Sequence, residues 1–273
     1  MLPKMPRHTP MVVVPILLVL ITFLFWYQTW FGRTLSDPEM QAYLAASAHP
    51  HKIQHALAQL SDRMARGDRT TARWYPQLLA LADSPNAELR LETAWVMGQD
   101  NQSEAFHQAL RKLLNDQAPL VRWNAALALA RFHDSAARPQ LRAMLEPFTL
   151  TAPGAGVLEF RAKEGDTTRR GAVVARLDAG EGEKKLELRT PLDGRVVKLL
   201  APEGARVASG QELVVMEPAE SQVIQALAAF GLVGGPEDIA AVKRFCRPDS
   251  GASPGERRQA EAALNALRER AGH

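Results

Sequence analysis

The chain has 273 residues, a formal net charge of +3 and 46% hydrophobic residues, which is enough for one or two domains with a hydrophobic core. Basic and acidic residues are nearly balanced from Arg33 to Glu217, so no one-sided basic surface is expected and nucleic-acid binding is excluded as a prediction. The lone Cys246 allows no internal disulfide, and we expect it to be a small buried residue at a helix end.

The first predicted element is a membrane-spanning helix. Residues 11–31 carry no charged side chain, and a helix of that length covers about 30 Å, the thickness of a bilayer core. Basic residues precede the stretch, aromatic residues crowd its far end, and no small-residue cleavage site follows it. We therefore predict a cytoplasmic tail over residues 1–10 and a transmembrane signal anchor over residues 11–32. The protein would be a single-pass protein of a bacterial inner membrane with its C-terminal bulk in the periplasm.

Three histidines follow in the sequence AHPHKIQH. His51 and His55 are four residues apart and would share one face of a helix, where their imidazoles could bind zinc or copper. The alternative is a helix start with solvent-facing histidines. Both residues are retained as candidate metal ligands.

Residues 37–147 are predicted to form helical repeats. The stretch from Leu89-Arg90 to Gly98 returns after 32 residues, beginning at Val121-Arg122, with small residues at matching helical positions. The shared pattern, D-x-x-x-x-V-R-x-x-A-A-x-A-L, resembles HEAT repeats of the short bacterial type. That resemblance implies paired helices in which Arg90 and Arg122 tie a helix to the neighbouring turn, which is a structural role.

Residues 153–218 contain one β-motif twice. Each copy ends with two glycines six residues apart, Gly165 and Gly171 in the first and Gly204 and Gly210 in the second, which suits tight turns with a positive φ angle. With the sequence TPLDGRVV, the repeat resembles the biotinyl/lipoyl-like domains of carrier and membrane-fusion proteins. The resemblance implies an all-β barrel-sandwich hybrid.

The central hairpin of this β-domain is the place where carrier proteins of that family present a modified lysine. Here the turn reads AGEGEKK, and Lys184 and Lys185 are the candidate attachment residues. The alternative is a solvated turn whose lysines serve solubility. Counting back from Gly194 by the spacing usual in that family lands on Glu183 and not on a lysine, so no cofactor is predicted. The turn also lacks the long helical arm that membrane-fusion proteins often insert at this point.

Helical spacing returns over residues 220–270, where Arg257 and the alanines after it repeat the pattern that begins at Arg122. The predicted fold is therefore mainly α: a single transmembrane helix and a HEAT-like α-solenoid that the β-domain interrupts. Solenoids tolerate such insertions because each repeat packs only on its neighbours.

No catalytic motif for phosphate binding, dinucleotide binding or nucleophilic attack occurs in the chain. We therefore expect a non-enzymatic scaffold, anchored in the membrane and exposed to the periplasm, that binds membrane proteins of an inner-membrane complex. Two alternatives stay open: a biotin or lipoyl carrier subunit modified at Lys184 or Lys185, and a periplasmic adaptor of a transport system.

Overall fold

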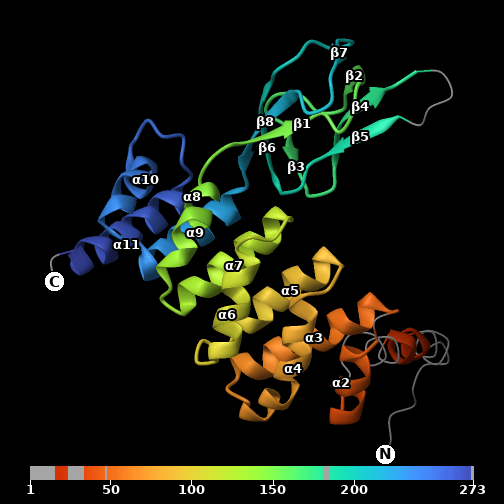
Figure 1. Cartoon of the computed structure of the whole chain (residues 1–273), viewed down its shortest axis with the longest axis vertical. Helices are drawn as coiled ribbons and strands as arrows, with labels where there is room; N and C mark the ends of the chain where they lie inside the picture. The colour runs from red at the N-terminus through yellow and green to blue at the C-terminus, as the bar shows by residue number, and fades with distance from the viewer. Residues whose placement is uncertain (1–15, 24–33, 47, 181–184, 272–273) are drawn as a thin grey trace, which may run out of the picture. The chain divides into compact units, whose positions relative to one another are not determined.

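The computed structural model describes residues 16–23, 34–46, 48–180 and 185–271. Over these ranges the chain is mainly helical and also forms two small antiparallel sheets (Figure 1). The chain divides into two compact units, residues 1–59 and residues 60–273.

The predicted membrane anchor over residues 11–32 is wrong. No helix in the described ranges combines the length and the apolar character that crossing a membrane requires. Residues 16–23 are helical, and roughly 20 helical residues are needed to cover a bilayer core. The rest of the predicted span and the predicted tail over residues 1–10 lie outside the described residues. This finding overturns the assignment as a single-pass inner-membrane protein and the periplasmic location that depended on it.

The first unit contains α2 (Asp37–Leu44) and most of α3 (Pro50–Ala65). The start of α2 is capped because the Glu39 carboxylate accepts a 3.0 Å hydrogen bond from the backbone N–H of Ser36. The backbone N–H of Leu35 donates to the side chain of Gln59 at 2.8 Å, which ties the entry of α2 to α3.

The helices of the second unit follow one another along the chain, except that the β-strands separate α8 from α9. Their bounds are α4 (Tyr75–Ala82), α5 (Ala87–Met97), α6 (Glu104–Leu113), α7 (Pro119–Arg131), α8 (Arg138–Ala143), α9 (Glu220–Val233), α10 (Ile239–Lys243) and α11 (Pro254–Ala271). Four 3₁₀ turns accompany them: η1 (Arg69–Trp74), η2 (Ser135–Ala137), η3 (Pro236–Asp238) and η4 (Arg244–Cys246). Side-chain caps start several of the helices, as at Asn86, whose Oδ1 accepts a 2.9 Å bond from the N–H of Glu88.

Helix packing continues across the β-strands that separate α8 from α9 in the sequence. Helix α5 packs on α7, α7 on α9 and α9 on α11, while α8 packs on both α7 and α9 (Figure 1). Fully buried alanines in these helices let neighbouring backbones approach closely, among them Ala94, Ala125, Ala126 and Ala260. Residues more than 80 positions apart thus meet in one stack of helices.

The strands form two four-stranded antiparallel sheets. One sheet has the order β1-β8-β6-β3, from β1 (Phe148–Thr151), β8 (Glu212–Pro218), β6 (Gly194–Leu199) and β3 (Thr167–Thr168). The other has the order β5-β4-β2-β7, from β5 (Leu186–Arg189), β4 (Val173–Asp178), β2 (Gly156–Phe160) and β7 (Arg206–Val207). Leu158 pairs with Leu177 in one register, and Val196 pairs with Met216 in the other.

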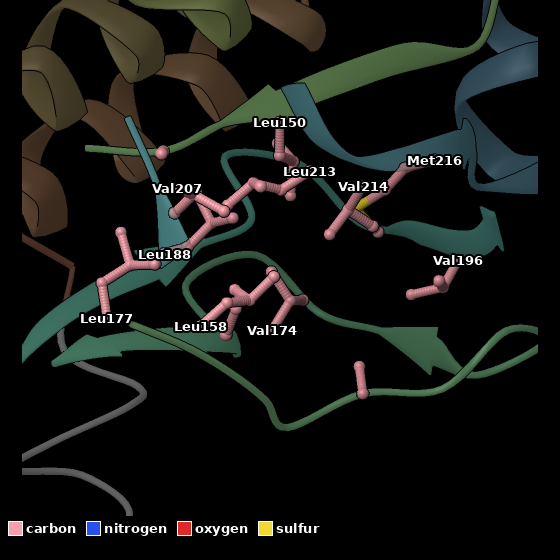
Figure 2. Close-up of a cluster of buried hydrophobic side chains, with 13 residues drawn as sticks. Leu150, Leu158, Val174, Leu177, Leu188, Val196, Val207, Leu213, Val214 and Met216 are labelled. Carbon is pink, nitrogen blue, oxygen red and sulfur yellow. The ribbon is translucent and has the colours of Figure 1, made fainter. Parts of the chain in front are cut away.

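The two sheets share one apolar core, which Figure 2 shows. Leu158, Val174 and Leu177 come from one sheet, and Val214 and Met216 come from the other. The prediction of a barrel-sandwich hybrid is nevertheless wrong, because the described strands remain in two separate ladders that do not close into a barrel. The strands at one edge of each sheet, β3 and β7, are only two residues long, too short to carry the hydrogen bonding further.

The repeated glycines of the β-strands do adopt the conformation that their spacing predicts. The φ angles of Gly165, Gly171, Gly204 and Gly210 are 91°, 81°, 75° and 78°, in the left-handed region that favours glycine. Each glycine ends a short turn between strands, so the internal repeat of the sequence is a repeat of turn geometry.

Candidate protein-binding groove

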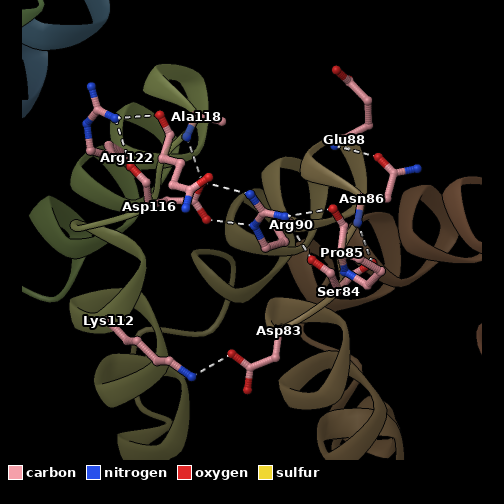
Figure 3. Close-up of polar contacts among 11 residues, drawn as sticks. Asp83, Ser84, Pro85, Asn86, Glu88, Arg90, Lys112, Asp116, Ala118 and Arg122 are labelled. Carbon is pink, nitrogen blue, oxygen red and sulfur yellow. Dashed lines mark hydrogen bonds and ion pairs between the residues drawn. The ribbon is translucent and has the colours of Figure 1, made fainter.

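One set of polar contacts, here called the repeat seam, joins consecutive helix pairs through Arg90, Asp116 and Arg122 (Figure 3). The guanidinium of Arg90 binds the Asp116 carboxylate with two hydrogen bonds of 2.6 and 2.9 Å and also donates to the carbonyl of Ser84 at 2.8 Å. Arg122 repeats the second contact, donating to the carbonyl of Asp116 at 2.7 Å. The predicted role of Arg90 and Arg122 as structural ties is confirmed.

The charged groups of the repeat seam are paired with one another within the chain. The side chains of Arg90 and Asp116 are 16% and 7% exposed, so both charges lie largely out of water. The hydrogen bonds from Arg90 hold the pKa of the Asp116 carboxyl below its ordinary value, and the backbone N–H of Ala118 adds a further bond at 2.8 Å. A carboxylate that is ionised and fully bonded in this way stabilises the fold and has little capacity for chemistry.

A second buried carboxylate, Asp134, works in the same manner. Arg111 donates to it at 2.5 and 3.1 Å, His107 lies 2.8 Å away, and the backbone N–H of Ala136 caps the other oxygen at 2.9 Å. The hydrogen bond from Arg111 is the largest cause of a pKa for Asp134 far below the usual range. Asp134 therefore holds α6 to the turn after α7.

The candidate functional site is an apolar groove of about 530 Å³ on the surface of α5, α7 and α9. Its walls carry two large side chains that are exposed to solvent: Trp95, which is 50% exposed, and Leu232, which is 42% exposed. Most of the remaining lining is small or aliphatic, and Gln225 adds an uncharged polar side chain; the small and aliphatic residues are Gly98, Leu127, Ala128, Ala228 and Ala229. This volume lies in the range of about 300–1,000 Å³ that is typical of ligand-binding pockets.

The groove forms because α5 and α7 come unusually close at its floor. A Cβ atom added at Gly98 would lie 2.8 Å from the Cβ of Ala128, a separation that real side chains do not tolerate. Asn124 reinforces the contact by donating to the carbonyl of Leu91 at 3.2 Å. Because the residues at this contact are small, the larger side chains of the same helices project beyond it and form the walls of the groove.

One charged residue lines the groove. Arg131, at the end of α7, donates through one terminal nitrogen to the carbonyl of Gly98 at 3.2 Å and to the side chain of Gln99 at 3.1 Å. Its own carbonyl accepts a 2.9 Å bond from Asn101. No acidic side chain is among the described residues that line the groove, and the two groups that accept hydrogen bonds from the Arg131 guanidinium are uncharged.

The predicted metal ligands do not gather into a site. The imidazole of His55 lies 2.8 Å from the amide nitrogen of Gln59 and contacts the ring of Tyr43, whereas the ring of His51 packs near that of His49. Within the part of the chain that the structure describes, no group of three or more His, Cys, Asp or Glu residues could hold a metal ion.

Of the two predicted attachment lysines, the structure describes Lys185. Lys184 lies outside the described residues, and Lys185 is exposed, with its ammonium 3.4 Å from Glu159 and 3.5 Å from Asp178.

Cys246 is half-buried at the end of η4, and burial raises the pKa of its thiol. A thiol of that kind is mostly protonated at neutral pH and is a poor nucleophile.

One part of the helical region matches a known protein family. Residues 75–148 match the family model for HEAT repeats, so this part of the chain consists of HEAT repeats, as its period of 32 residues predicts. The match covers α4 to α8 and hence the repeat seam and two of the three helices of the groove. A search of curated proteins found no significant match.

Several solved structures share local similarity with the chain. They include an aspartoacylase family protein from Mesorhizobium loti (20% identity, 26% of this chain and 25% of that chain, TM-score 0.24) and a succinylglutamate desuccinylase / aspartoacylase family protein from Shewanella amazonensis (29%, 26% and 20%, 0.24). A single-chain, multi-domain long-chain acyl-CoA carboxylase also matches (27%, 50% and 14%, 0.25). The chain thus spans a quarter or less of each of these proteins, and such low TM-scores transfer neither fold nor activity.

Sequence reasoning identified the seam arginines but missed both their partners and the groove. Asp116 stands 26 residues after Arg90, and only the fold reveals that they meet. The available signal for the groove was the presence of a large apolar residue, Trp95, between Ala94 and Gly98 of the repeat pattern. Leu232 could not be paired with it from sequence, because the β-strands separate the two residues in the chain.

Proposed function

We propose that this protein is a non-catalytic scaffold that binds a partner protein in the groove of α5, α7 and α9. The observation that carries the proposal is the exposure of Trp95 and Leu232 above a floor of small residues. Exposed apolar side chains that line one concave surface are typical of protein-binding sites, and aromatic residues are enriched among those that dominate binding energy.

The chemistry of the groove supports binding over catalysis. Arg131 is the single titratable side chain among the described lining residues, and it has neither a general base nor a nucleophile beside it. HEAT arrays offer extended surfaces because neighbouring repeats align the same helix faces. The match to HEAT repeats over residues 75–148 supports a role in protein interaction and leaves the partner open.

The test is affinity purification of the tagged full-length protein from its own cells, with quantitative mass spectrometry of the bound proteins. Leu232→Ser should reduce a stoichiometric partner at least tenfold, since loss of an apolar anchor in a groove costs about 2 kcal/mol of binding. Leu200→Ser is the matched control, because Leu200 is 38% exposed and lies among the β-strands.

Circular dichroism should show that both variants remain folded. Equal recovery of every partner by the parent, Leu232→Ser and Trp95→Ala would refute binding in the groove. Loss of the partner in Leu200→Ser alone would move the binding surface to the β-strands.

A further inference from the structure

The residues that line the groove indicate which kind of molecule it binds. Its walls and floor are mostly apolar, Gln225 of α9 is an uncharged polar residue of the lining, and its one charge is the positive charge of Arg131 at the end of α7. The two hydrogen bonds from the guanidinium to Gly98 and Gln99 share a single terminal nitrogen, which fixes the group without neutralising it. Both acceptors are uncharged.

Resting on the proposed function, we propose that the groove binds an amphipathic helix of a partner protein that carries an acidic side chain beside its apolar residues. An occupant that covers Arg131 with apolar atoms alone would strip water from an uncompensated charge, which is costly. A carboxylate instead forms paired, charge-assisted hydrogen bonds with a guanidinium. The single positive charge therefore selects against a basic occupant and in favour of an acidic one.

We infer a helical occupant because the groove offers few hydrogen-bonding groups to a peptide backbone. Its lining residues all come from α5, α7 and α9, or from the turn residue that ends α5, and no strand of either sheet lines it. Gln225 is the one side-chain amide of the lining that could bond to an extended segment, so most of that segment's backbone N–H and C=O groups would lack partners, whereas a helix satisfies its own. A helix also presents large apolar side chains at spacings of three and four residues, which suits a row of small residues between two walls.

The experiment uses the full-length protein in its own cells with the photocrosslinking residue p-benzoylphenylalanine in place of Leu232, or of Leu200 as the matched control. Mass spectrometry then identifies the crosslinked segment. We expect capture at position 232 only, and a captured segment with apolar residues at helical spacing and an aspartate or glutamate within one turn of them.

A charge swap then tests the ion pair with the purified proteins. Arg131→Glu should weaken binding of the captured partner at least tenfold, and replacing the partner's acidic residue by arginine should restore most of that loss. Arg131→Lys keeps the charge and should bind within a fewfold of the parent. Arg258→Glu changes the net charge equally at an exposed position of α11 and should bind like the parent.

The outcomes separate this inference from the proposed function. Absence of any crosslink at position 232 above the level at position 200 would overturn both. Capture of a basic segment, of an apolar segment without an acidic residue, or of residues 16–23 of a second copy would keep the groove as a binding site and overturn the acidic helix. Unchanged affinity of Arg131→Glu for an acidic segment would also overturn it.

Discussion

The repeat seam and the groove both use α5 and α7, and they differ in whether their side chains find partners within the chain. In the seam, Arg90 and Asp116 are largely buried and meet two or more hydrogen-bond partners each within the chain. In the groove, Trp95 and Leu232 remain about half exposed above a packed floor. The polar groups of the seam bond one helix pair to the next, whereas the groove leaves apolar surface open to another molecule.

This difference predicts which substitutions affect which property. Changes in the seam or in the packed interior should reduce the free energy of unfolding, because they leave a buried charge or a polar group without partners. Changes at exposed groove walls should reduce binding and leave stability within about 0.5 kcal/mol.

The largest loss of stability is expected for Ala126→Asp. Ala126 is fully buried in α7, so the substitution places a carboxylate between packed helices without a partner. Chemical denaturation should show a loss of about 3–5 kcal/mol. Ala105→Asp is the matched control, because Ala105 is exposed in the first turn of α6, where a negative charge is tolerated. Similar unfolding midpoints for the two variants would contradict the assigned packing of α7.

Arg90→Ala tests the seam directly. Removing the guanidinium leaves the Asp116 carboxylate, which is 7% exposed, without its charged partner and should cost about 3 kcal/mol. In a double-mutant cycle, Asp116→Ala should cost much less in the Arg90→Ala background than in the parent. Additive losses would mean that the two residues stabilise the chain independently and that the seam does not couple the repeats.

The acid limb of the stability curve provides a third test, through Asp134. The pKa of this carboxyl is lower in the folded chain than its usual value of 3.8, so the unfolded chain binds the proton more readily. Its contribution is therefore fully present above that value and is lost as the pH falls below about 4. Asp134→Asn should cost about 2 kcal/mol at neutral pH, and the gap to the parent should narrow from pH 5 to pH 3 in thermal melts. A gap that stays constant with pH would contradict a charged role for Asp134.

The sequence predicts the parts of this molecule that depend on local pattern. The spacing of Arg90 and Arg122 and the small residues after them are properties of a short repeat, and the HEAT repeats they predict are present. Positive φ angles at Gly165 and Gly204 follow from glycines at the ends of apolar runs. In each case the chemistry of a few neighbouring residues decides the outcome.

The failures concern features that depend on distant residues or on surroundings. Whether two β-motifs close into a barrel depends on the lengths of the edge strands, and β3 and β7 have two residues each. A low-charge apolar stretch predicts a spanning helix from hydropathy alone, and no described helix meets that requirement. The groove joins Trp95 to Leu232 across an insertion, which no local pattern reveals.

The smallest expected effect on stability is at Gly98, in the floor of the groove. Gly98→Ala would bring a methyl group within 2.8 Å of Ala128, so α5 and α7 must separate slightly, at a cost of about 1–2 kcal/mol. Gly231→Ala is the matched control, because its Cβ would lie 3.9 Å from the nearest heavy atom, in α11, and alanine favours a helix by about 1 kcal/mol. Denaturation should therefore shift the two variants in opposite directions. Because Gly98 also forms the floor of the groove, its alanine variant should lose affinity for a partner as well as stability, while Gly231→Ala should gain stability and keep its affinity. A Gly98→Ala protein as stable as the parent would show that the helices are not in close contact there and that the groove floor is wider than this packing allows.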